Sequence, residues 1–169
     1  EDIIKKRENE NLSLFSINEA NVSKARNYGA QQASGEILIF LDADTCLEED
    51  SLQKIKQQFL VKHSVATTLV NPYHKKFQFL MNIKNFYNKT GLYKGCSGAL
   101  ICRKKDFETI DGYNSKIIVR EHRKLIEKLL KNGKYHCIDT TVTTSMRRFN
   151  NWGLIRSGYF WIKQLIKDK

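Results

Sequence analysis

A short apolar run that ends abruptly in acid constrains the fold of this chain more than any other feature. Residues 37–41 are Ile-Leu-Ile-Phe-Leu, and Asp42-Ala43-Asp44 follow at once. A continuous apolar run of this length predicts a strand buried on both faces, as in a parallel sheet between helices. Ligands bind open α/β sheets beyond the carboxyl ends of such strands, so the aspartates stand where a binding site is expected.

Alternating segments on both sides of this run predict an α/β sandwich with a mostly parallel central sheet. Helices are expected over 21–33, 49–61, 77–87, 104–110 and 120–132, and further strands over 12–17, 65–70, 99–102 and 135–138. Glu1 to Arg7 has a helical pattern with no capping residue before it. We therefore expect that the first strand or strands of the sheet precede this chain and are missing from it.

The composition is that of a globular domain with a strong positive charge. The 169 residues are 41% hydrophobic, and 29 lysines and arginines against 18 acids give a formal net charge of +11. Such a surplus favours an anionic partner: a phosphorylated small molecule, an acidic membrane surface or nucleic acid. The basic residues are spread along the chain without a recognised nucleic-acid motif, so no nucleic-acid partner is expected.

The cysteines favour reduced thiols in a cytoplasmic protein. The sequence has four cysteines but no Cys-x-x-Cys pair and no histidine at zinc-finger spacing. This pattern argues against a structural zinc site and against disulfides. No apolar stretch reaches the roughly 18 residues needed to cross a bilayer. We expect the protein in the cytoplasm, either free or at the inner face of the membrane.

Asp42 and Asp44 form a candidate metal site. Two carboxylates one residue apart repel each other unless a cation lies between them. Hard oxygen ligands suit Mg²⁺ or Mn²⁺, and two carboxylates leave coordination positions for substrate phosphates. We expect both side chains to face a shared cleft at the end of a central strand. The alternative is a simple turn with an aspartate helix cap, because this pattern is common by chance.

Two ordered motifs precede and contain the apolar run at 37–41. The first is Asn21-Val22-Ser23-Lys24-Ala25-Arg26-Asn27-Tyr28-Gly29-Ala30, and the second extends from Ala33 to Asp44. Together they resemble the central signature of family-two glycosyltransferases of the GT-A fold, in which an A-R-N-x-G helix precedes a strand ending in D-x-D. The resemblance implies Asp44 as main metal ligand and Asp42 as a metal or ribose contact. It also implies that Arg26 and Asn27 line the donor pocket or brace the aspartate loop.

The resemblance continues in the middle of the chain. The matching residues are Gly95-Cys96-Ser97-Gly98-Ala99, then Arg103, Phe107 and Asp111-Gly112-Tyr113. They are similar to the family's acceptor-side segment, where small residues let the backbone approach a ligand closely. We expect Gly98 to contact the donor. The alternative is that these glycines only form turns.

A further helix carries the candidate general base. Glu121-His122-Arg123-Lys124-Leu125, followed by Gly133, resembles the family pattern E-D-x-x-L-x-x-R-L-x-x-x-G, with His122 where aspartate is usual. The resemblance implies that one of the two residues takes the acceptor proton while the nucleotide diphosphate leaves, which inverts the anomeric carbon. Glu121 is suited to this role, and so is His122, whose ordinary pKa lies near neutrality.

The last part of the chain combines arginines with an amphipathic segment. Arg147 and Arg148 lie in a stretch that resembles the end of the catalytic domain in some bacterial and archaeal members. Guanidinium groups offer forked donors to a diphosphate, so the pair is expected to bind the donor phosphates; the alternative is ordinary surface charge. We divide the chain into a glycosyltransferase core over 1–153 and an amphipathic tail over 154–169. The tail either packs on the core or contacts a membrane interface.

The sequence thus predicts inverting, metal-dependent transfer of a sugar from a nucleotide-sugar donor to a glycan or lipid-linked acceptor. Mn²⁺ or Mg²⁺ is the expected cofactor. The main alternative is a truncated, catalytically inactive module that binds a sugar nucleotide, or one part of a larger assembly. That alternative is supported by His122 and by the expected absence of an N-terminal segment. A nucleotidyltransferase is disfavoured by the A-R-N helix and the arginine pair.

Overall fold

The structure is a computed structural model, and it describes residues 12–92, 94–96, 98–117 and 119–167. The helices are α2 (Val22–Gln32), α3 (Ser51–Gln58), η1 (Lys75–Phe77), α4 (Gln78–Thr90), α5 (Lys104–Thr109), α6 (Glu121–Leu129) and α7 (Arg147–Lys167). The strands are β1 (Ile37–Phe40), β2 (Thr45–Leu47), β3 (His63–Pro72), β4 (Leu100–Arg103) and β5 (Lys134–Thr144). The helix expected near the start of the chain lies outside the described residues.

The described strands form one sheet in the order β1-β4-β3-β5-β2. β3 and β5 run parallel, whereas β1 with β4, β4 with β3, and β5 with β2 run antiparallel. The expected α/β sandwich is present, but its sheet is mixed rather than mostly parallel. An apolar run shows that a strand is buried on both faces, and this burial does not fix the direction of its neighbours.

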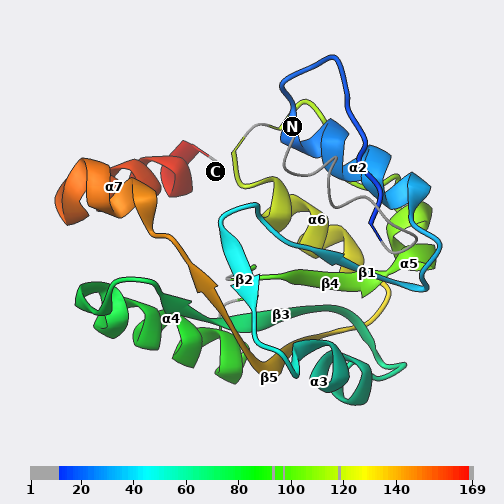
Figure 1. Ribbon diagram of the computed structural model, residues 1–169, viewed down its shortest axis with the longest axis horizontal. Coiled ribbons are helices and arrows are strands. Elements are labelled where there is room, and N and C mark those ends of the chain that lie inside the picture. Colours follow the sequence, from blue (N-terminus) through cyan, green and yellow to red (C-terminus); the bar gives the residue numbers. More distant parts are fainter. Residues whose placement is uncertain (1–11, 93, 97, 118, 168–169) are drawn as a thin grey trace.

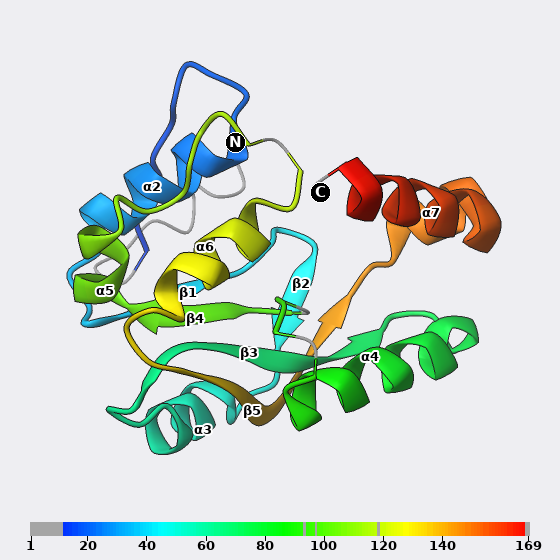
Figure 2. The same ribbon diagram turned by 180° about the vertical axis from the view of Figure 1, so that it is seen from behind.

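Alternate residues of a strand belong to different hydrophobic clusters, one on each side of the sheet. Val65 and Leu100 belong to the cluster that includes helices α2, α5 and α6, whereas Ala66 and Ile101 belong to the cluster that includes α3. Figures 1 and 2 show these helices on opposite sides of the sheet. Successive side chains of a strand point to opposite faces, which explains this division. A further cluster joins β3 and β5 to α4 and the start of α7.

Helix α2 begins at the capping residue that the sequence predicts. Asn21 has extended backbone angles, and its side-chain oxygen accepts a hydrogen bond from the Lys24 N–H at 3.0 Å. This bond satisfies a backbone donor that has no partner inside the helix. The helix closes at Ala33 and not at a left-handed Gly35. Lys104 Nζ donates to the Ala33 carbonyl at 2.6 Å and so helps to close the helix.

One predicted strand is absent, and one strand that was not predicted is present. Residues 13–17 form neither helix nor strand, and Phe15 instead packs edge to face against Tyr28 of α2, with ring centres 5.8 Å apart. β2 was not expected, because its Thr-Cys-Leu sequence is short and directly follows the aspartates. It exists because β5 is longer than predicted and pairs with it, Thr45 facing Thr144.

Helix α7 is broken at Gly153, where φ is 74° and ψ is 168°. Glycine adopts this left-handed backbone without the steric penalty of a Cβ. The break stands beside the predicted boundary between core and tail, but the division itself stays a prediction. Within the described residues, none of the helices combines the length and apolarity that crossing a bilayer requires.

Candidate active site

Arg26 of α2 lies between two acids that the sequence singles out. Its Nη2 donates to Asp42 Oδ1 at 2.6 Å, and its Nη1 donates to Glu121 Oε1 at 2.7 Å. The Arg26 and Glu121 side chains are 12% and 14% exposed, whereas that of Asp42 is 57% exposed. Charge-assisted bonds to a planar guanidinium fix both carboxylates in space. One side chain therefore joins the turn after β1 to the first residue of α6.

His122, the next residue of α6, is held by Tyr113. The Tyr113 hydroxyl lies 2.9 Å from His122 Nδ1, and Arg26 lies over the Tyr113 ring, 5.4 Å from its centre. Tyr113 is buried, so its hydroxyl needs a partner inside the protein. Asn27 fixes the same loop, because its amide donates to the Tyr113 carbonyl and accepts from the Tyr113 N–H. Asn27 thus braces this loop and not the loop of the aspartates.

The surroundings of His122 keep its imidazole neutral near pH 7. Burial and the charge of Arg26 lower the pKa of His122 to about 4, and Glu121 and Asp42 offset only part of this shift. Burial also raises the pKa of Tyr113, so its hydroxyl keeps a proton to donate to Nδ1. His122 Nε2 lies 3.9 Å from Glu121 Oε1. The carboxylate favours the tautomer that carries its proton on Nε2.

Arg26 stays charged in the same cluster. Burial lowers the pKa of Arg26, but the hydrogen bonds that Arg26 donates to the carboxylates of Glu121 and Asp42 raise it, so that the net shift is upward. The charge of Arg26 adds to the effect of burial in keeping the nearby His122 neutral. In this cluster Arg26 is therefore charged, and His122 is neutral.

A separate set of contacts holds Asp44. The Ser145 hydroxyl donates to Asp44 Oδ2 at 2.7 Å, and the Ser145 N–H donates to the Asp44 carbonyl at 3.3 Å. The Arg147 N–H in turn donates to Ser145 Oγ at 3.4 Å, and Arg147 is exposed. The pairing of β2 with β5 brings these segments together. The aspartate turn and the start of α7 are therefore neighbours in space.

The two aspartates have the ligand chemistry that Mg²⁺ or Mn²⁺ requires. Both are exposed, and within the described residues Asp42 Oδ2 and Asp44 Oδ1 accept no hydrogen bond. The described part of the chain contains no group of three or more His, Cys, Asp and Glu that could hold a metal ion. Two carboxylates alone make an incomplete coordination shell, which fits a cation shared with substrate phosphates.

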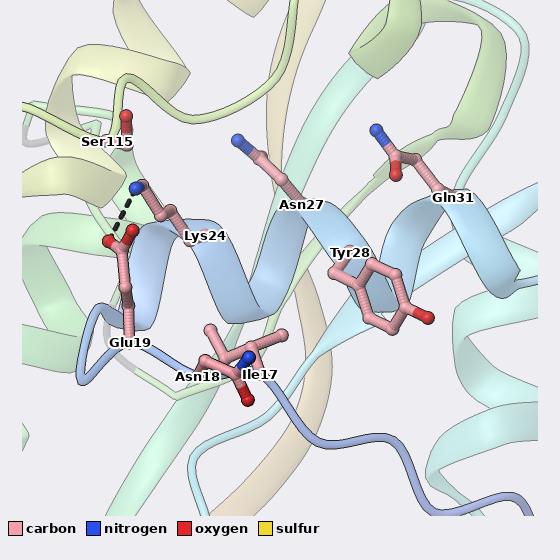
Figure 3. A pocket seen from close by; sticks show the side chains of 8 residues that line it. All are labelled: Ile17, Asn18, Glu19, Lys24, Asn27, Tyr28, Gln31 and Ser115. Carbon is pink, nitrogen blue, oxygen red and sulfur yellow. Dashed lines mark hydrogen bonds and ion pairs between the residues drawn. The ribbon is translucent and has the colours of Figure 1, made fainter.

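Two surface pockets lie elsewhere. One, of about 340 Å³, lies beside α2, where Lys24 pairs with Glu19 and Tyr28 forms part of the wall (Figure 3). Another, of about 350 Å³, lies between the loop after α5 and helix α6. Neither includes Asp42 or Asp44, so the shared cleft expected for them stays a prediction. Among the described strands β1 lies at the edge of the sheet, and the expected central position of this strand stays a prediction, because it depends on strands expected to precede the chain.

The remaining predicted residues are placed as follows. Gly98 lies against the side chains of Val142 and Thr68, and a Cβ on it would collide with both. Packing within the protein thus explains this glycine, and its predicted contact with the donor stays a prediction. The side chain of Arg148 lies outside what the structure describes. The pairing of Arg26 with Glu121 was not foreseen.

Sequence reasoning also missed the roles of Ser145 and Tyr113. Both stood in motifs that the sequence singled out, but nothing local indicated their partners. The Ser145 contact spans 101 residues, from Asp44 in a turn to a segment after β5. The only hint in the sequence was proximity to predicted site residues. Tyr113 precedes His122 by 9 residues, and Ser145 stands just before the arginine pair.

The family can now be stated. The sequence profile of the family described as Glycosyl transferase family 2 matches residues 1–109, which include α2, Arg26 and the aspartate turn. This match covers more than half of the chain. The chain therefore belongs to the family-2 glycosyltransferases, as the motifs around Asp42 indicated.

The fold is also found in a solved structure. The crystal structure of residues 1–349 of TarS from S. aureus superposes with a TM-score of 0.62 at 16% identity, and the match covers 85% of this chain and 47% of TarS. A likeness at this identity shows the fold alone, and it confirms the expected GT-A-like architecture. The chain spans about half the length of that structure. Among curated proteins, none matches the chain.

Proposed function

We propose that the protein transfers a sugar from a nucleotide-sugar donor to the hydroxyl of a glycan or lipid-linked acceptor, with inversion and with Mn²⁺ or Mg²⁺ as cofactor. The observation that carries the proposal is the position of Arg26 between Asp42 and Glu121. It brings the acid of the D-x-D turn and the first acid of α6 into one cluster. Membership of the family supplies the reaction class.

Glu121 is the candidate base that the geometry favours. Its Oε1 accepts from Arg26 and faces His122, whereas its Oε2 has no hydrogen bond or ion pair with any described residue. We assign Oε2 to take the acceptor proton while the acceptor oxygen bonds to the anomeric carbon and the nucleoside diphosphate leaves with its electron pair. His122 is a weaker base than an ordinary histidine, because burial and Arg26 lower its pKa to about 4.

Asp42 and Asp44 are the proposed metal ligands. A bound divalent cation would supply positive charge to the diphosphate as it leaves. Asp44 is the main ligand in this proposal, because Ser145 holds one of its oxygens and leaves the other exposed. Asp42 shares its carboxylate with Arg26 and serves as a metal or ribose contact.

The arginines after β5 complete the proposed donor site. Arg147 follows Ser145 closely and is therefore near the aspartate turn. Guanidinium groups at this place would bind phosphate oxygens with paired donors and stabilise the charge that develops on the leaving group. Arg148 is proposed for the same role from the sequence. Arg26 and Asn27 act as positioning residues, since their contacts are with Glu121, Asp42 and Tyr113.

The test compares Glu121→Gln with His122→Ala. Transfer from a panel of nucleotide sugars is followed by release of nucleoside diphosphate, and donor affinity is measured separately. We expect Glu121→Gln to lower turnover by about 10²-fold or more and to leave donor affinity nearly unchanged. Glu127→Gln is the matched control, because this acid of α6 is exposed and pairs with Arg123 at 3.0 Å.

Two outcomes would change the proposal. A loss with His122→Ala but not with Glu121→Gln would transfer the role of base to His122. Donor binding without transfer by the natural protein and by His122→Asp, which restores the usual acidic pair, would favour the inactive binding module.

A further inference from the structure

Helix α4 turns its apolar side outward. Phe79 and Phe86 are 76% and 60% exposed, and Ile83 between them is 41% exposed. At 3.6 residues per turn these positions share one face, opposite the buried Met81 and Asn88. A surface helix normally shows the reverse arrangement, with its large apolar residues toward the core. The outward side of α4 therefore requires an explanation beyond the packing of this domain.

The inward side of α4 is correspondingly polar. The Asn85 amide donates to the Val70 carbonyl at 2.9 Å and accepts from the Val70 N–H at 3.0 Å. Asn85 thus satisfies both backbone groups of a β3 residue, as a neighbouring strand would. Lys84 is half-buried on the same side, and burial lowers its pKa. Polar contacts, together with Met81, attach the helix to the sheet.

The surroundings of the outward side are basic. The sequence has no acid between Asp50 and Asp106, and Lys75, Lys76 and Lys94 are exposed. Lys89, also on α4, pairs with Asp139 of β5 at 3.0 Å. Figures 1 and 2 show α4 along the outside of β3, with no other element drawn on its far side.

We infer that α4 docks on a lipid bilayer that contains anionic phospholipids. The docking surface, called here the α4 face, consists of Phe79, Ile83 and Phe86 of α4 together with Lys75 and Lys76 of η1, which directly precedes the helix. Its aromatic and aliphatic side chains enter the boundary between headgroups and acyl chains, and its lysines contact lipid phosphates. This inference does not depend on sugar transfer. It also concerns a surface different from the tail, whose predicted membrane contact stays a prediction.

Charge distinguishes a bilayer from a second copy of the chain. A two-fold dimer would place the α4 face against itself. That contact would bring lysines together without any carboxylate on the face to pair with them, and like charges across an interface are unfavourable. An anionic bilayer complements both parts of the face, because it offers an apolar interior below a layer of phosphates.

The test measures binding of the protein to vesicles of phosphatidylcholine alone and of phosphatidylcholine mixed with phosphatidylglycerol. We expect at least about tenfold tighter binding to the anionic vesicles. The combined variant Phe79→Ser, Ile83→Ser and Phe86→Ser should bind them roughly 100-fold more weakly. Lys75→Gln with Lys76→Gln should weaken binding to the anionic vesicles by about tenfold and leave binding to neutral vesicles unchanged.

A matched control removes exposed apolar residues elsewhere. Leu52 and Val61 are 62% and 92% exposed near α3, and Leu52→Ser with Val61→Ser should bind vesicles like the natural protein. Circular dichroism checks that each variant is folded. The inference is overturned if anionic and neutral vesicles bind equally, or if the α4 variant binds like the natural protein. It is also overturned if a concentration-dependent dimer disappears in the α4 variant while vesicle binding persists.

Discussion

The two sides of the candidate active site differ in how completely their polar groups are paired. On the α6 side, Arg26, Tyr113, Glu121 and His122 are largely withdrawn from water and linked to one another. On the aspartate side, Asp42 and Asp44 are exposed, and Asp44 is held through Ser145. The α6 side is thus organised by the fold itself. On the aspartate side, Asp42 Oδ2 and Asp44 Oδ1 accept no hydrogen bond from the described residues and are available to a ligand.

This difference predicts how substitutions on each side would affect stability and ligand binding. A group in the linked cluster contributes to the stability of the fold, because removing it leaves another polar group buried without its partner. A group on the exposed side contributes little to stability, since water replaces its partner. Variants on the α6 side should therefore unfold more easily, whereas variants on the aspartate side should fold normally and bind less.

The largest effect on stability is expected for Arg26→Met. This change leaves the Glu121 carboxylate, 14% exposed, without its cation and should lower the free energy of unfolding by about 3–4 kcal/mol. Urea unfolding measures it. Arg123→Met is the control: Arg123 is 40% exposed and pairs with Glu127 within α6, so a loss of less than about 1 kcal/mol is expected. Equal losses in the two variants would remove the distinction between the two sides.

A smaller effect should follow from pH through His122. Its pKa is about 4 in the folded protein and about 6.5 in an unfolded chain. Below pH 6.5 the unfolded chain therefore binds the extra proton, so folding is favoured less as the pH falls from 6.5 toward 4. The contribution reaches about 2–3 kcal/mol at the lower end. Above pH 6.5 the ring is neutral in both states, and no such dependence is expected.

Subtracting the unfolding free energy of His122→Gln from that of the natural protein at each pH isolates the contribution of His122. His63 and His136 also have lowered pKa values, because burial disfavours their charged forms. These two histidines also lower the unfolding free energy as the pH falls. Because the variant retains both, their contribution cancels in the comparison. As the pH falls from 6.5 to 4, the unfolding free energy of the natural protein should drop by about 2–3 kcal/mol relative to that of the variant. Parallel curves for the two proteins would show that His122 titrates alike in the folded and unfolded states.

Local sequence signals predicted most of the elements but not how they pair. The Asn21 cap, the apolar run at 37–41 and the periodicity of α6 depend on neighbouring residues, and the structure contains the elements that they indicate. Strand directions and the existence of β2 depend on partners distant in sequence. The outward apolar side of α4 has the same periodicity as an inward one. Periodicity identifies a helix without telling which side meets the core.

The candidate site shows the same limit. The acids and arginines were found because their types and motifs carry chemistry, whereas the bonds between them were not foreseen. Arg26 reaches Glu121 across 95 residues, and no pattern in the sequence gives that contact. Gly98 illustrates a related limit, because Thr68 and Val142 leave no room for a side chain at this position, whereas its predicted contact with the donor stays a prediction. A small residue in a motif indicates that another group comes close to the backbone, but it does not indicate whether that group belongs to a ligand or to the protein.

The smallest effect is expected on the aspartate side, in binding of Mn²⁺ measured by water proton relaxation. Because Asp42 and Asp44 give an incomplete shell, Mn²⁺ should bind more tightly when a nucleoside diphosphate is present. Asp44→Ala should weaken this binding by about tenfold. It should leave the free energy of unfolding within about 0.5 kcal/mol of the natural value, as expected for an exposed group. Asp139→Ala is the control, because that exposed acid pairs with Lys89 and is not a proposed ligand. If Mn²⁺ binds Asp44→Ala as tightly as the natural protein, the metal site lies elsewhere. If Asp44→Ala instead unfolds as readily as Arg26→Met, both sides of the site are structural, and the contrast between them fails.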